Sequence, residues 1–136
     1  MKPETSAALA DADRALSNSR AILSIDIPDQ AARLAYYAQF YAAQALIFER
    51  TGKVAKTHKG VNKEFHKQAM AEPTFPPRFA AQLTQAYEYK EVADYNSSAP
   101  PITSMQARDA QATAERFVAA IRLALASPTG SSTSAP

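Results

Sequence analysis

Cysteine is absent from the 136-residue sequence, and glycine occurs only three times. The absence of cysteine excludes disulfide bonds and thiolate metal sites, and it is compatible with a reducing compartment. No apolar run is long enough to cross a bilayer, and the first residues lack the apolar core of a signal peptide. We therefore expect a cytoplasmic protein that does not enter membranes.

The common self-contained enzyme motifs are also missing. The sequence has no glycine-rich phosphate loop, no Gly-x-Ser-x-Gly motif and no dinucleotide fingerprint. Its two histidines, His58 and His66, are too far apart along one helix to form the usual paired metal ligands. We expect neither a bound metal nor a cofactor. Because Thr57 and His58 open a predicted helix, we expect the His58 side chain to hydrogen-bond at that helix start.

Alanine is abundant, and the scarcity of glycine likewise favours helices. Helical periodicity, with proline and glycine at the breaks, predicts an all-α, five-helix up-and-down antiparallel bundle. Asp29 is a candidate cap for the second helix, Gly52 ends it, and Thr103 with Gln106 has the spacing of a capping box. We expect one helical domain over residues 1–126, followed by a flexible Ser/Thr/Pro tail over 127–136. The predicted helices are 5–24, 29–51, 57–71, about 77–95 and about 103–126.

The second predicted helix is apolar or aromatic on nearly every face between residues 34 and 48. A helix of this kind is either central in its bundle or buried on one side by a partner chain. Its aromatic residues recur at helical spacing, which favours core packing. Arg33 and Gln44 are candidate partners for the tyrosine hydroxyls. These aromatic residues are Tyr36, Tyr37, Phe40 and Tyr41.

Positive charge is concentrated in one segment, residues 50–67, which carries a net charge of +5 in a chain of net charge +2. A solvated helix face is the simpler interpretation of such a run. The alternative is a phosphate-binding edge, which would give salt-sensitive affinity for nucleic acid. Farther along, Lys90 and Asp94 are spaced as a surface ion pair on one helix.

Three segments, in this order, resemble the HEPN family of small prokaryotic helical proteins. Residues 32–46 are similar to its Arg-x-x-Tyr-Tyr-Ala-x-Phe-x-Ala-Ala-x-Ala-Leu helix. Residues 56–61 are similar to its Lys-Thr-His-x-Gly-Val segment, and residues 93–96 to its Ala-Asp-Tyr-Asp helix ending. The fifth predicted helix also fits, so that the resemblance spans residues 8–126.

The resemblance implies a homodimer in which the ends of the fourth helices face each other across a cleft. Many relatives are ribonucleases of toxin–antitoxin systems, paired with a nucleotidyltransferase antitoxin that in some cases modifies a tyrosine near the active motif. By this resemblance the catalytic candidates are Lys90, Asp94 and Tyr95. The candidates for holding RNA or phosphate are Arg33, Lys53, Lys56, His58, Lys59 and Lys63.

The catalytic motif departs from the family pattern in two ways. Lys90 stands where the family has arginine, and no histidine follows in range. Lysine lacks the rigid donor fork of arginine, and without an imidazole the best acid–base group near neutral pH is missing. We therefore expect a dimeric domain that binds RNA, a nucleotide or a protein partner, with ribonuclease activity weak or lost. The alternative is an active, metal-independent toxin-type endoribonuclease paired with a nucleotidyltransferase antitoxin.

Overall fold

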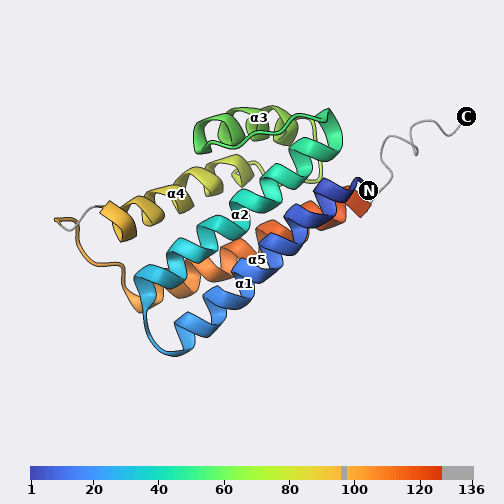
Figure 1. Ribbon diagram of the computed structural model, residues 1–136. Coiled ribbons are helices and arrows are strands. Elements are labelled where there is room, and N and C mark those ends of the chain that lie inside the picture. Colours follow the sequence, from blue (N-terminus) through green and yellow to red (C-terminus); the bar gives the residue numbers. More distant parts are fainter. Residues whose placement is uncertain (96–97, 127–136) are drawn as a thin grey trace, which may run out of the picture.

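A computed structural model describes residues 1–95 and 98–126. Within these ranges the chain forms five α-helices and no strand, as the sequence predicts. They pack as an elongated bundle in which α1, α2 and α5 lie side by side (Figure 1). The predicted tail, residues 127–136, lies outside the described residues. The helices are α1 (Pro3–Ser24), α2 (Pro28–Thr51), α3 (His58–Met70), α4 (Phe79–Tyr95) and α5 (Ser104–Ala126).

Proline and glycine set the ends of the first two helices. Pro3 and Pro28 occupy first-turn positions, where a missing N–H costs nothing and the fixed φ suits a helix. The predicted cap at Asp29 is wrong, because Ile27 is the N-cap residue and Asp29 lies in the first turn of α2. Gly52 ends α2 in the left-handed conformation, with φ of 72°.

Threonine side chains start two of the later helices. The Thr57 hydroxyl accepts a hydrogen bond from the Gly60 backbone N–H at 3.0 Å and so caps α3. At the start of α5, the Gln106 N–H donates to the Thr103 hydroxyl at 3.0 Å. The Thr103 N–H donates to the Gln106 side-chain oxygen at 2.9 Å, which completes the predicted capping box.

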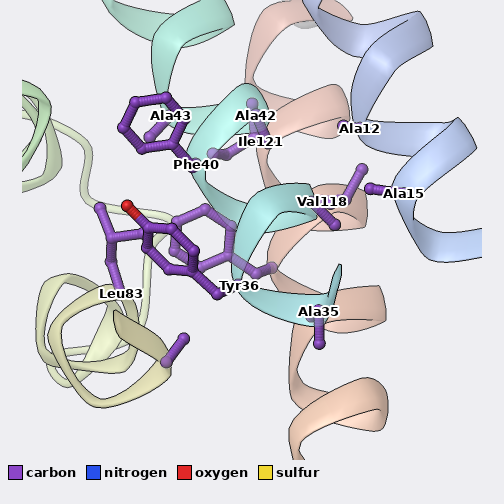
Figure 2. Packing of buried hydrophobic residues seen from close by; sticks show 14 of the residues in the cluster. Ala12, Ala15, Ala35, Tyr36, Phe40, Ala42, Ala43, Leu83, Val118 and Ile121 are labelled. Atoms are coloured by element: carbon purple, nitrogen blue, oxygen red, sulfur yellow. The ribbon is translucent and has the colours of Figure 1, made fainter. Parts of the chain in front are cut away.

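The second helix is the centre of the bundle and contacts each of the other four helices. Alanines such as Ala12, Ala35 and Ala42 lie where α1, α2 and α5 meet, and their small side chains allow close packing (Figure 2). Tyr36 and Phe40 are buried, as expected. The all-round apolar surface of α2 is therefore covered by its own chain and does not by itself require a partner chain.

The connection between α2 and α3 determines where α3 begins. The Gln44 side chain donates a hydrogen bond to the Ala55 carbonyl at 2.8 Å, which ties this connection to α2 about two turns before the helix ends. At full extension the seven residues from Thr51 could span at most about 23 Å, against ~22 Å of α2 between Thr51 and Tyr36. The connection thereby brings the start of α3 back to the level of Tyr36, where the side chains of His58 and Tyr36 meet.

None of the helices in the described part of the chain combines the length and the apolarity needed to cross a membrane.

Candidate functional site

Four charged side chains from α2 and α4 form one ion-pair cluster. Arg33 Nε donates to Asp94 Oδ1 at 2.7 Å. Lys90 Nζ lies 3.2 Å from Asp94 Oδ2 and 3.6 Å from Glu91 Oε2. The side chains of Lys90 and Asp94 are only 13% and 17% exposed, so the predicted ion pair forms but is largely covered. We call these four residues the charge cluster; their formal charges balance.

Tyrosine rings surround the charge cluster. The Lys90 ammonium lies 5.7 Å from the centre of the Tyr87 ring and 5.1 Å from that of Tyr95. The Arg33 guanidinium lies 5.1 Å from the Tyr37 ring centre. Each distance is within the range of a cation–π contact. Tyr95 is 76% exposed, which leaves its ring accessible to a binding partner.

His58 joins this site from the first turn of α3. Its ring stacks on Tyr87, with 3.6 Å between ring centres and 10° between planes. Its Nδ1 atom lies 3.0 Å from the Tyr36 hydroxyl oxygen. The prediction that His58 hydrogen-bonds at the helix start is therefore wrong, because Thr57 caps α3 while the imidazole turns toward α2 and α4.

The predicted partners of the buried tyrosine were also wrong. Arg33 binds Asp94, and Gln44 binds the Ala55 carbonyl, so that neither is the partner of Tyr36. The Lys-Thr-His segment contained the signal for the true partner, since it is the one of the three family-like segments that carries a histidine. The contact of His58 with Tyr36, 22 positions earlier in the chain, depends on the path of the connecting loop.

The surroundings of His58 and Lys90 act on their protonation in opposite directions. Burial lowers the pKa of His58 below its ordinary 6.5, and the Lys90 ammonium adds to this effect while Glu91 opposes it. Partial burial alone would lower the pKa of Lys90, but the hydrogen bond to Asp94 and the nearby Tyr37 raise it overall. At neutral pH the site therefore combines a neutral imidazole with a fixed ammonium cation.

A groove of about 400 Å³ between α1 and α2 adjoins the charge cluster. Arg14 and Arg33 line it together with Tyr37 and Tyr41. Both tyrosines pack against the core, as expected, but they are only partly buried, whereas Tyr36 and Phe40 lie within it. Arg33 and Tyr37 belong both to the lining of the groove and to the surroundings of the charge cluster. The groove and the charge cluster therefore form one continuous polar surface.

Part of the positive charge of the basic segment is paired in the folded chain. Arg50 is paired with Glu72 at 2.6 Å, and Glu64 lies 3.4 Å from both Lys53 and Lys67. Of the candidates for holding RNA, Arg33 and His58 lie at the site. The remaining candidates are exposed side chains of the basic segment: Lys53, Lys56, Lys59 and Lys63.

Within residues 1–95 and 98–126, no three histidine, aspartate or glutamate side chains lie close enough together to hold a metal ion. The chemistry that the arrangement offers is that of fixed cations, a carboxylate and an imidazole beside exposed aromatic rings. These groups suit the recognition of a phosphodiester flanked by bases.

Comparison with known proteins finds a similar sequence and a solved structure of similar fold. A protein of Methanocaldococcus jannaschii named "Putative toxin MJ0142" is 27% identical over 97 residues, which are 71% of this chain and 65% of that protein. The chain thus spans slightly less than two thirds of that relative. The crystal structure of TT1696 from Thermus thermophilus has a TM-score of 0.74 at 18% identity, over 89% of this chain and 98% of that one.

At that identity the likeness to TT1696 concerns the fold alone. A match to the HEPN domain family runs from residue 5 to residue 124 and so includes every residue of the charge cluster as well as His58. Because this match covers nearly the whole chain, the chain belongs to the HEPN domain family.

Proposed function

We propose that this HEPN domain is a toxin-type protein that binds RNA at the charge cluster and the adjoining groove. The observation that carries the proposal is the convergence of Arg33 from α2 and Lys90 from α4 on Asp94. Asp94 holds both cations in place within a largely covered site. Arg33 uses Nε for this contact, so the two terminal nitrogens of its fork can serve a phosphate.

The groove supplies the remaining features of a single-strand site. Tyr37 and Tyr41 offer partly exposed aromatic faces for stacking bases. Arg14 lies beside them and is paired through Nη1 with Asp11 of the same groove at 2.7 Å, which leaves its other donors for a phosphate. Base stacking tolerates any sequence, which suits a protein acting on many RNAs. The exposed lysines of the basic segment add long-range attraction that weakens with salt.

The active assembly in this proposal is a homodimer that places the ends of two α4 helices opposite each other. The family resemblance supports this arrangement, and so does the exposed ring of Tyr95 at the end of α4. Light scattering with the purified chain at micromolar concentration is expected to give the mass of two chains. A monomer at that concentration would contradict the dimer.

RNA binding is tested by fluorescence anisotropy with a labelled single-stranded RNA at low salt. We expect Arg33→Gln to weaken binding about tenfold, because a single charge-assisted phosphate contact is worth roughly 1.5–3 kcal/mol. Arg116→Gln is the matched control, since it removes the same charge from an exposed position of α5. No binding by the unchanged protein, or equal affinities of the two variants, would contradict the proposed site.

The alternative with a catalytic role is an active ribonuclease toxin held in check by a nucleotidyltransferase antitoxin. The relative named as a putative toxin supports this candidate. Expression of the chain alone is then expected to arrest growth, and Asp94→Ala is expected to relieve the arrest. Normal growth on expression, with cellular RNA intact, would instead favour a binding module that cuts nothing.

A further inference from the structure

We infer that a narrow groove between α4 and α5 receives an arginine side chain of a protein partner. Gln39 of α2 forms the floor of this groove. The described residues that line it all differ from those of the charge cluster and of the groove between α1 and α2, so the inference does not depend on the proposed RNA binding. The polar side chains that α4 and α5 contribute to the lining are Gln82, Gln85, Tyr89, Asp109 and Thr113.

The amide of Gln39 is buried without a partner for its oxygen. The residue is 1% exposed, and within residues 1–95 and 98–126 its Oε1 atom accepts no hydrogen bond. Buried polar groups are nearly always paired, because an unpaired acceptor destabilises the fold. A half-turn about the last side-chain bond exchanges the amide oxygen and nitrogen, so the oxygen can face the groove that Gln39 lines. The floor of the groove therefore suits a ligand that donates hydrogen bonds.

The size of the groove limits what can reach its floor. Its volume is about 30 Å³, which gives room for about two water molecules and thus only for a slim group. A nucleobase or an aromatic side chain is too wide for this space. The guanidinium of arginine is small and flat, and it stands at the end of a long unbranched stem that reaches the floor from outside.

The charge of the lining favours a cation with several donors. Among the described residues that line the groove, Asp109 is the one that carries a charge, and it is exposed at the rim. A guanidinium has donors on all its edges, so it can serve the Gln39 oxygen and the Asp109 carboxylate together. The partly exposed ring of Tyr89 adds an aromatic face on which a guanidinium stacks. An ammonium lacks this flat face and has fewer donors.

The surroundings of the groove indicate that a protein partner supplies the arginine. Between Arg78 and Glu88 the sequence of α4 has no charged residue, although 21% of the chain is charged. Depletion of charge around a buried anchor is characteristic of the centre of a protein interface, and arginine is a frequent anchor there. A free amino acid would bring a carboxylate, and the described lining has no lysine or arginine to pair with it. The arginine of a polypeptide lacks that carboxylate.

The ligand class is tested by NMR titration of the isotopically labelled full chain with N-acetyl-arginine methylamide, whose ends are blocked as in a polypeptide. We expect the side-chain amide signals of Gln39, identified by their loss in Gln39→Met, to shift and to saturate. The blocked citrulline analogue, which has a neutral group of the same shape, and the blocked lysine analogue should each need an about tenfold higher concentration. No saturable shift, an equal response to citrulline or lysine, or tighter binding of free arginine would overturn the inference.

Variants test the named groups in the same titration. Asp109→Asn should weaken binding of the blocked arginine about threefold, and Glu4→Gln, which removes the same charge from an exposed position of α1, should leave it unchanged. Gln39→Met should abolish the binding and raise the melting temperature, because it removes an unpaired buried acceptor. Gln111→Met should lower the melting temperature, since Gln111 donates to Glu115 Oε2 at 2.9 Å.

Equal binding by Asp109→Asn and Glu4→Gln, or full binding by Gln39→Met, would contradict the site. A lower melting temperature of Gln39→Met would mean that the fold itself uses the amide, and it too would overturn the inference. The affinity of Gln39→Met for RNA should equal that of the unchanged protein, so that failure of the proposed RNA binding is seen separately from failure at this groove.

Discussion

Arg50 Nη2 lies 2.6 Å from Glu72 Oε1, and this ion pair joins the end of α2 to the segment between α3 and α4. The Glu72 side chain is 4% exposed, and it also accepts a hydrogen bond from the Thr74 hydroxyl at 2.5 Å. Together these donors lower the pKa of Glu72, the Thr74 contact most strongly. Arg50, which belongs to the basic segment, is therefore paired with Glu72 in the fold.

Arg50→Ala is expected to lower the free energy of unfolding by about 3 kcal/mol, because it leaves the buried carboxylate of Glu72 without its cation. Urea denaturation followed by circular dichroism measures this difference. Arg108→Ala, at an exposed position of α5, is the control and should change stability by less than about 0.5 kcal/mol. Equal stabilities of the two variants would show that the pair contributes nothing.

Close packing of α2 predicts a penalty for added volume. Ala42 is fully buried where α1, α2 and α5 meet, so Ala42→Leu is expected to destabilise the fold by about 1–3 kcal/mol (Figure 2). The same change at exposed Ala119 of α5 should have little effect. Thermal unfolding of both variants tests this, and a tolerated Ala42→Leu would mean that the three helices can separate to admit the larger side chain.

Loss of the helix cap at the start of α5 is expected to lower the stability of the fold by less than the changes at Arg50 or Ala42. Thr103→Ala removes the hydroxyl that accepts from the Gln106 N–H and is expected to cost about 1 kcal/mol. Thr103→Ser keeps an acceptor in the same place and should retain most of that stability. Denaturant midpoints of the three proteins decide the matter, and identical losses for serine and alanine would argue against capping as the cause.

The lowered pKa of His58 predicts how stability depends on pH. The unfolded chain binds a proton here near the ordinary pKa of 6.5, whereas the folded chain resists it until a lower pH. The stabilising contribution is therefore complete above about pH 6.5 and is lost as the pH falls through the folded-state pKa.

The measurement compares melting temperatures of the unchanged protein and His58→Gln at several pH values. We expect the advantage of the unchanged protein to be larger at pH 8 than at pH 5. His66→Gln serves as the control for loss of a histidine from α3. A difference that stays constant with pH would mean that His58 has the same pKa in the folded and unfolded chain.

Local chemistry in the sequence determined the helices. Alanine content, helical periodicity, Gly52 after α2 and the capping box at Thr103 each depend on residues close in the chain, so five helices and their approximate ends could be predicted. The central place of α2 also followed from its apolar faces, because a helix without a polar side must be buried. The pairing of Lys90 with Asp94 needed only their spacing of one helical turn.

Tertiary structure alone decided the composition of the candidate site. Arg33 and Asp94 are 61 positions apart and His58 and Tyr36 are 22 apart, so no local pattern links them. The predicted helix-start role for His58 failed because Thr57 supplied the cap and freed the imidazole for α2 and α4. Which side chains share a surface depends on the path of connecting segments and on helix packing, and these are properties of the whole fold.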